Sequence, residues 1–170
     1  YPATDAARTA KGTGFYASHP EWFWPRGEAG AKAYGQLCWS NASLVAFVTK
    51  QVVKILRAQP YANIISVSQN DNGQRCRDPH EEAINNRSGS PLGALLTAVN
   101  TIAAANEDEV PHVAVDALAY HRSRPRPPPR LKPRRTALVR RCSLASHFAT
   151  PLTPPTHVPL GQDRAGWVGG

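Results

Sequence analysis

The segment NIISVSQNDNGQRC, residues 63–76, decides the fold class of this chain. Its first six residues, 63–68, are short, rich in β-branched side chains and bounded by turn formers, which is typical of a buried strand. The strand is followed at once by a dense cluster of amides, one carboxylate and a glycine. This cluster is either a simple turn, which such residues tolerate well, or the polar end of a strand that presents a binding site.

Helical and strand patterns alternate on both sides of this segment. Apolar residues recur at three- and four-residue steps from Leu44 to Leu56, after a possible cap at Ser40 or Asn41, and again in the segment 90–110. A short helix is expected over 78–84, with Asp78 as its cap. Further strands are expected at 112–120 and 136–143. Strands that alternate with helices predict an α/β fold with right-handed crossover helices and about three parallel strands.

The positive charge of the chain is local. The 170 residues fit one domain and carry a net charge of +8, but nearly half of the 20 basic residues lie between 122 and 141, where there is no acid. Residues 122–135 form an Arg/Pro-rich stretch. Such a stretch either binds a polyanion or is a solvated loop, and the near absence of aromatic residues favours the loop. We therefore do not expect nucleic acid as a partner.

The chain ends and the cysteines give weaker indications. Residues 1–14 are expected to be a frayed terminus and 153–170 a disordered tail. No apolar run is long enough for a membrane span, and no metal or cofactor site is predicted from Cys38, Cys76 and Cys142. A disulfide between Cys38 and Cys76 is possible, although two free thiols are the more frequent outcome. Two glycosylation triplets, at Asn41 and Asn86, slightly favour an extracellular or secretory location.

A series of motifs in the chain resembles a known family. The motifs are HPEWF (19–23), GQLCWSN (35–41), ISVSQNDN (65–72), CRDPHEEAI (76–84), GSPLGALLTAVNTIA (89–103), HVAVDALAY (112–120), KPR (132–134) and RCS (141–143). Together, over about 15–152, they closely resemble domain of unknown function 4838. That family looks like a glycoside-hydrolase (β/α)8 barrel. The resemblance departs at 140–146, where an acid usual in the family is missing.

The resemblance implies a partial barrel with a carbohydrate ligand. A complete barrel of this type needs about 250 residues, so residues 15–152 are expected to supply about three strands, with the missing strands in the rest of a longer chain. The strand ends carry the site in such barrels, which places Asp71, Tyr120 and Ser143 at one edge. Asp71 would then be a catalytic carboxylate, with Asn70 and Asn72 binding sugar hydroxyls. The alternative is that these residues only form a turn.

Glycoside hydrolysis usually needs a second carboxylate, and the candidates are Glu21, Asp116 and Asp78, the last of which is expected to serve as a helix cap. Glu21 and Trp22 lie in an aromatic segment, 15–24, which we interpret as a loop that offers a stacking surface or is anchored by buried tryptophans. Asp116 is alternatively a structural acid paired with an arginine or a backbone group. The remaining candidate substrate-binding residues are His19, Tyr120 and His121. The sequence therefore predicts a carbohydrate-binding domain with possible hydrolytic activity, and a non-catalytic polyanion-binding domain or an inactive fragment as alternatives.

Overall fold

The computed structural model of the chain describes residues 15–24, 35–71, 73–120, 123 and 131–141. The expected frayed terminus at 1–14, most of the Arg/Pro-rich stretch and the expected tail at 153–170 lie outside these residues.

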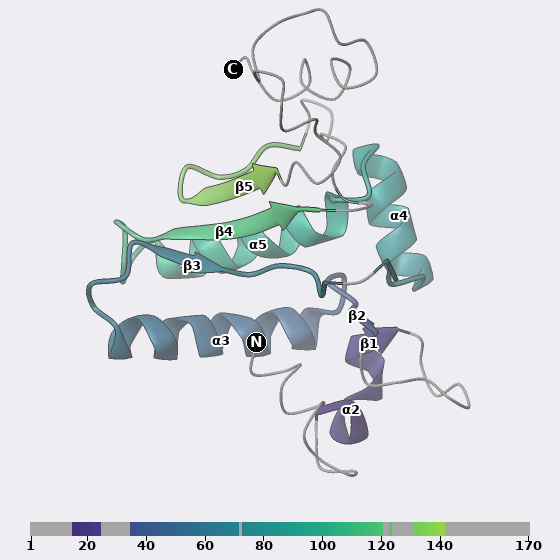
Figure 1. Cartoon of the computed structure of the whole chain (residues 1–170), viewed down its shortest axis with the longest axis horizontal. Helices are drawn as coiled ribbons and strands as arrows, with labels where there is room; N and C mark the ends of the chain where they lie inside the picture. Colours follow the sequence, from purple (N-terminus) through teal and green to yellow (C-terminus); the bar gives the residue numbers. More distant parts are fainter. Residues whose placement is uncertain (1–14, 25–34, 72, 121–122, 124–130, 142–170) are drawn as a thin grey trace, which may run out of the picture.

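A three-stranded parallel sheet organises the fold (Figure 1). Its strands are β3 (Ile64–Ser66), β4 (Ala114–Ala119) and β5 (Ala137–Arg141), in the order β3-β4-β5. Ser66 lies opposite Asp116, which in turn lies opposite Leu138. The prediction of an α/β fold with three parallel, neighbouring strands is therefore confirmed.

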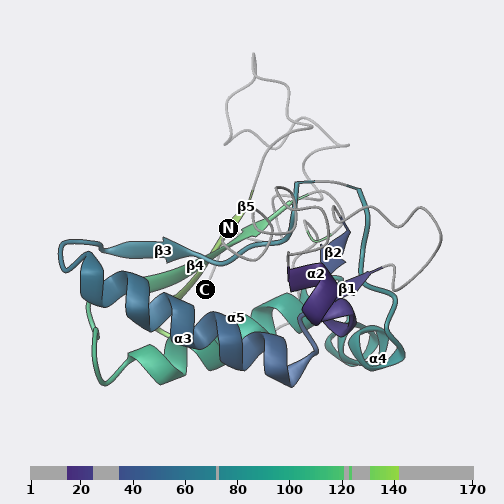
Figure 2. The ribbon, with the colours of Figure 1, turned by 90° about the horizontal axis from the view of Figure 1, so that it is seen from below.

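Two long helices cover one face of this sheet (Figure 2). They are α3 (Ala42–Ala58) and α5 (Gly93–Asn106). As predicted, Asn41 caps α3, because its side-chain oxygen accepts a hydrogen bond from the Leu44 N–H at 3.1 Å. Ser90 accepts one from the Leu92 N–H at 3.1 Å just before α5. The helices pack against the sheet through their apolar stripes, which include Leu44, Val48, Val52, Leu56, Leu96, Val99 and Ile102. Each such side chain contributes roughly 1.5–3 kcal/mol when fully buried.

Helix α4 (Pro79–Ser88) lies beyond the carboxyl ends of the strands (Figure 1). Asp78 caps it by accepting a hydrogen bond from the His80 N–H at 2.9 Å. The helix ends at Gly89, whose φ of 66° favours glycine. Helix α5 begins only a few residues later and approaches α4 closely. The approach is so close that a Cβ on Gly93 would collide with the side chain of Ser88. The close packing of α4 on α5 thus depends on a glycine.

The aromatic segment 15–24 is more regular than predicted. It contains helix α2 (Phe15–Ser18), the 3-10 helix η1 (Pro20–Trp22) and strand β1 (Phe23–Trp24), which pairs antiparallel with β2 (Gln36–Leu37). The interpretation of the whole segment as a loop was therefore wrong. The physical reason is aromatic packing: the ring of Phe15 lies 4.9 Å from that of Phe47 on α3, and Phe23 is buried.

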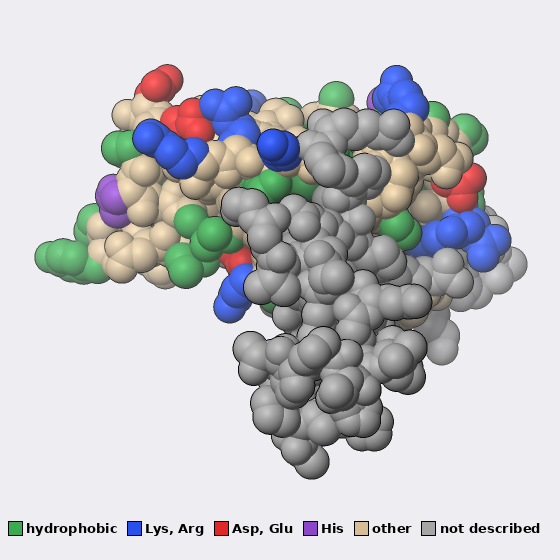
Figure 3. Space-filling view, turned by 90° about the horizontal axis from the view of Figure 1, so that it is seen from above, with side chains coloured by type: hydrophobic (Ala, Val, Ile, Leu, Met, Phe, Trp, Pro, Cys, Tyr) green, Lys and Arg blue, Asp and Glu red, His purple; other side chains and the backbone are tan. Residues whose placement is uncertain are grey.

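The outer surface carries scattered charge. Figure 3 shows lysine and arginine side chains spread over one face of the described structure, without a single continuous basic patch. No helix within the described ranges is both long and apolar enough to cross a membrane.

Candidate functional site

Gln69 and Ser123 join the carboxyl ends of β3 and β4. Gln69 follows β3, and its amide nitrogen donates a hydrogen bond to the Tyr120 carbonyl oxygen at 3.1 Å. The Ser123 hydroxyl donates to the Gln69 side-chain oxygen at 2.7 Å and accepts from the Tyr120 N–H at 3.0 Å. The polar residues after β3 therefore first serve to hold two strand ends together.

Asn70 docks the small antiparallel sheet onto the same edge. Its N–H donates to the Gln36 side-chain oxygen at 3.0 Å, and the Gln36 amide nitrogen donates to the Asn70 carbonyl oxygen at 2.8 Å. The Asn70 side-chain nitrogen donates to the Gly35 carbonyl oxygen at 2.6 Å. This predicted sugar-binding amide is thus engaged in structural contacts.

Some of the predicted site residues belong to the part of the chain that the structure describes, and others do not. Asp71 is exposed just beyond the strand-end contacts, and Tyr120 is half-buried at the end of β4. Asn72, His121 and Ser143 lie outside the described residues. Asp71 and Tyr120 do lie at the carboxyl edge of the sheet, as the strand pattern predicted.

Asp116 sits in the middle of β4 and forms an ion pair. Its side chain is fully buried, and the Arg140 guanidinium on β5 donates to its two oxygens at 2.8 and 2.6 Å. The expected alternative for Asp116, a structural acid paired with an arginine, describes this arrangement. A catalytic role would require the carboxylate to leave its partner.

Trp22 is buried and packed against other residues of the aromatic segment. Trp22 is 3% exposed, and its indole N–H donates to the Ser43 hydroxyl at 2.7 Å. One face of the indole is covered by the His19 ring, which lies parallel to it at 3.9 Å between centroids. His19 in turn contacts the Glu21 carboxylate at 3.0 Å. The structure therefore brings His19, Glu21 and Trp22 together, but as a packed cluster that exposes little indole surface for stacking.

A cavity of about 610 Å³ lies between α4 and the carboxyl edge of the sheet. This volume is within the usual range for small-molecule sites. The wall combines amide and hydroxyl side chains with apolar ones and three charged residues. Its lining includes Gln36, Leu37, Trp39, Gln69, Gln74, Arg75, Cys76, Glu81, Glu82, Asn85, Asn86, Ser90, Pro91, Leu95 and Ser123. Asp71 is not part of this wall.

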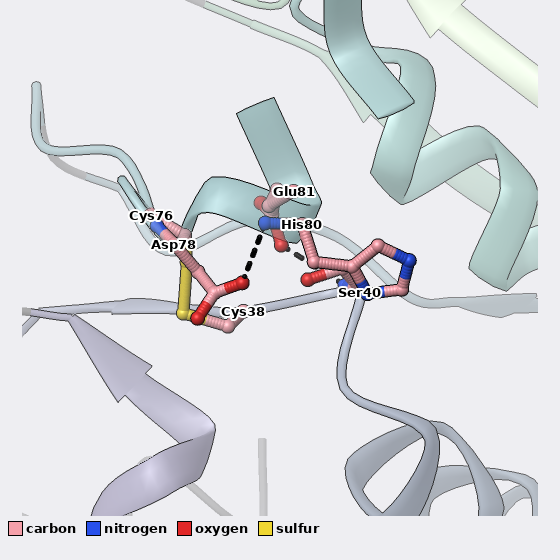
Figure 4. Close-up of a disulfide and its surroundings, with 6 residues drawn as sticks. All are labelled: Cys38, Ser40, Cys76, Asp78, His80 and Glu81. Atoms are coloured by element: carbon pink, nitrogen blue, oxygen red, sulfur yellow. Dashed lines mark hydrogen bonds between the residues drawn. A yellow bond between two sulfur atoms is a disulfide. The ribbon is translucent and has the colours of Figure 1, made fainter. Parts of the chain in front are cut away.

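Cys76 and Glu81 both line the cavity, and Figure 4 shows the disulfide of Cys76 close to the Glu81 carboxyl group. Cys38, directly after β2, is bonded to Cys76, which precedes α4. Of the two outcomes left open by the sequence, the less frequent one is therefore present. Glu81, in the first turn of α4, accepts a hydrogen bond from the Ser40 N–H at 2.9 Å. Two contacts, one covalent and one polar, thus tie α4 to the segment after β2.

Burial changes the acidity of Glu81. The residue is 6% exposed, and this burial raises the pKa of its carboxyl to about 7, although hydrogen bonds from Ser40 act in the opposite direction. The negative charge of Asp78 raises the pKa further. Glu81 therefore changes its protonation state near neutral pH, as proton-transferring groups in enzymes often do.

The sulfur atoms and Glu81 resemble a metal site only in their spacing. Ligand-type atoms of Cys38, Cys76 and Glu81 lie within 4.8 Å of one another. Because the two sulfur atoms are bonded to each other, neither is a thiolate that a metal ion could bind. Within the described ranges, this group offers a metal one carboxylate at most.

The model of one protein family matches the sequence over almost its whole length. The family is described as "Domain of unknown function (DUF4838)", and the match covers residues 9–169. The chain belongs to the DUF4838 family. No curated protein matched the sequence. The resemblance noted from the motifs is therefore confirmed at the level of the family.

The main chemical feature of this DUF4838 domain was missed from sequence. The sequence places Glu81 in the helix expected over 78–84, and its pattern gives no reason to expect this carboxyl to be buried. The signal lay in the motifs GQLCWSN and CRDPHEEAI, since each contains one half of the disulfide and one partner of the Ser40–Glu81 contact. In this chain the two cysteine-containing motifs lie on either side of α3 and β3, and the disulfide joins them.

Proposed function

We propose that this chain is a carbohydrate-binding, glycoside-hydrolase-like domain whose ligand occupies the cavity beside α4. The observation that carries the proposal is the composition and position of the cavity. It lies at the carboxyl edge of a parallel sheet, where ligands bind in most α/β proteins. Its wall holds many uncharged polar groups beside an aromatic and several apolar side chains. Amides fix the hydroxyl groups of a sugar, while apolar surfaces cover its ring faces.

The order of the elements supports a barrel-type architecture. The three parallel strands follow one another in sequence order, and both α3 and α5 cover the same face. A doubly wound sheet would place helices on both faces and reverse its strand order. Winding in one direction is the rule in (β/α)8 barrels. We therefore propose that these strands are part of such a barrel.

We further propose that the domain hydrolyses the glycan that it binds. Asp71 remains the proposed strand-end carboxylate, because it is exposed at the carboxyl edge of the sheet. Since Asp71 lies outside the cavity wall, the bond to be hydrolysed would have to extend beyond the cavity. Of the other proposed acids, Asp116 is neutralised by Arg140, and Glu21 lies in the cluster around Trp22. A glycosidase needs a second carboxyl group roughly 5–10 Å from the first.

The test is ligand binding with matched asparagine variants. Neutral oligosaccharides and heparin fragments are titrated into the chain, and affinities are measured by calorimetry. Asn86 lines the cavity, whereas Asn63 is exposed at the opposite end of β3. We expect Asn86→Ala to weaken binding of a neutral oligosaccharide about threefold to tenfold, the net value of one hydrogen bond. Asn63→Ala should leave the affinity unchanged.

A third variant distinguishes polyanion binding, the alternative function, from carbohydrate binding. Arg124, Arg126 and Arg130 belong to the Arg/Pro-rich stretch, which lies outside the described residues. Their joint replacement by alanine should not affect binding of a neutral sugar, because charges in solvent are screened within about 10 Å. If only heparin binds, and this triple variant abolishes that binding while Asn86→Ala does not, the polyanion-binding function replaces the carbohydrate one.

A further inference from the structure

We propose that Glu81 is the acidic ligand-binding group of the cavity: its carboxyl group donates a hydrogen bond to an acceptor oxygen of a neutral sugar. This inference rests on the proposed function and adds a specific residue, a direction of hydrogen bonding and a ligand charge to it. Three structural observations lead to it: the position of the carboxyl group, the hydrogen-bond donors that it faces and the charges around it.

The position is set by α4. Glu81 lies in the first turn of this helix and lines the cavity, although the residue is 6% exposed. Its neighbours in the wall include Trp39, which is 4% exposed and whose indole N–H has no hydrogen-bond partner among the described residues. The wall therefore contains a carboxyl group and an indole donor that are both shielded from bulk water.

The Glu81 carboxyl group accepts hydrogen bonds from the segment after β2, namely from the Ser40 N–H, the Ser40 hydroxyl and the Trp39 N–H. Oε2 accepts the Ser40 N–H at 2.9 Å, and Figure 4 shows the other oxygen pointing away from Ser40. A protonated carboxyl keeps its acceptor oxygen on the N–H and carries the proton on the other oxygen. In this form Glu81 holds Ser40 and still has one donor for a ligand.

The surrounding charges favour the protonated form. Arg75 and Glu82 are the other charged residues of the cavity wall, and they contact each other at 3.5 Å. The elements facing Glu81 from β2, the strand ends and the start of α5 contribute uncharged lining residues, among them Leu37, Gln69 and Leu95. Asp78 adds a further negative charge nearby, and burial raises the pKa of Glu81 to about 7. Below its pKa, the carboxyl of Glu81 is therefore neutralised by a bound proton and not by a neighbouring cationic side chain.

The same charges select a neutral ligand. A sugar acid would bring a further negative charge close to Glu82. Among the described residues of the wall, the one cation, Arg75, already contacts Glu82 and would not balance that charge. A neutral sugar offers ring, hydroxyl and glycosidic oxygens, each of which accepts a hydrogen bond from a carboxylic acid. Binding should therefore be strongest when Glu81 is protonated, and should weaken as the pH rises above the pKa of the carboxyl.

The test measures proton-linked binding by calorimetry. The probes are cellotriose, xylotriose and mannotriose, each titrated at about pH 5.5 and about pH 8, on either side of the raised pKa. We expect the affinity for the trisaccharide to fall roughly tenfold at the higher pH. Proton uptake on binding should show as a binding heat that changes with the ionisation enthalpy of the buffer. In Glu81→Gln, the amide still accepts the Ser40 N–H and still donates to a ligand, so the affinity should no longer depend on pH. The matched control, Glu82→Gln, should retain the pH dependence.

The outcomes are distinguishable. Binding by the natural chain with no proton uptake and no pH dependence overturns the role of Glu81, whether or not Glu81→Gln folds, and leaves the carbohydrate function intact. An unchanged pH dependence in Glu81→Gln overturns it as well. If no trisaccharide binds at either pH, the proposed function fails, and this inference fails with it.

Discussion

Asp116 on β4 and Arg140 on β5 form a diagonal ion pair across two parallel strands. Leu138 lies directly opposite Asp116 and Leu118 directly opposite Arg140, so the pair spans two residues of register. The carboxylate is fully buried, whereas 59% of the arginine side chain is exposed. The guanidinium therefore neutralises a buried charge from the solvent side.

Removal of the arginine should destabilise the fold strongly. Arg140→Leu leaves the Asp116 carboxylate buried without its cation, and we expect a loss of about 3 kcal/mol in the free energy of unfolding. Urea unfolding followed by circular dichroism measures this loss. The double variant Asp116→Leu/Arg140→Leu should recover most of it, since no buried charge remains. Arg57→Ala, which breaks an exposed pair with Glu109, should change stability by less than about 1 kcal/mol.

The carboxyl of Glu81 should make the stability depend on pH. Its folded pKa is raised from 4.5 to about 7, so between these values the unfolded chain loses a proton that the folded chain keeps. The free energy of unfolding should therefore fall as the pH rises through this window, by roughly 3 kcal/mol in total. In Glu81→Gln this contribution should vanish, while Glu82→Gln should retain it. Equal slopes in the natural chain and in Glu81→Gln would contradict the assignment.

The disulfide should contribute substantially to stability. It joins residues 38 apart in sequence, and closing a loop of this size restricts the unfolded chain by about 3–4 kcal/mol. Cys38→Ala/Cys76→Ala should lower the melting temperature accordingly. Addition of a thiol reductant should lower the melting temperature of the natural chain and leave that of the double variant unchanged. If the reductant lowers the melting temperatures of the natural chain and of the double variant equally, the disulfide does not account for the effect.

Substitution of Trp22 should lower the stability of the fold, whatever its effect on ligand binding. The residue is buried, donates to Ser43 and carries the His19 ring on its face. Trp22→Ala should lower the free energy of unfolding by roughly 3–5 kcal/mol, as expected for a large core side chain. Tyr61→Ala is the matched aromatic control, because Tyr61 is 94% exposed, and it should have little effect. A fully stable Trp22→Ala variant would show that the aromatic cluster is not part of the core.

Two glycines should differ in their tolerance of a methyl group. A Cβ on Gly93 would overlap with Ser88, whereas a Cβ on Gly73 would meet nothing within 4 Å. Gly93→Ala should therefore destabilise by about 1–3 kcal/mol through overpacking, and Gly73→Ala should not. Ser88→Gly combined with Gly93→Ala should relieve the overlap. Chemical denaturation of the three variants tests this point.

The fold was predictable where one local signal dominated. The β-branched run at 63–68 and the apolar steps of Leu44–Leu56 gave the parallel strand and α3, and the Asp78-Pro79 pair gave the start of α4. The aromatic segment 15–24 was not, because its structure depends on contacts with Phe47 and Ser43 far along the chain. Periodicity contains no information about such partners.

The site was less predictable than the fold for a related reason. The carboxyl edge of the sheet was expected from strand direction, and Asp71 and Tyr120 do lie there. Glu81 was not expected, since its burial arises only when α4 meets the segment after β2. Gln69 and Asn70 have the residue types of a sugar site, yet their hydrogen bonds join strands. Residue type alone does not separate a ligand-binding amide from a structural one.

The Cys38–Cys76 bond turns part of the chain into a covalent ring. The ring encloses the whole of α3 and β3, together with the exposed Tyr61 in the connection between them. A chymotrypsin cut after Tyr61 would therefore open the ring without releasing a fragment. The nicked chain should migrate as one species on a non-reducing gel and separate into two pieces once the sulfur–sulfur bond is reduced.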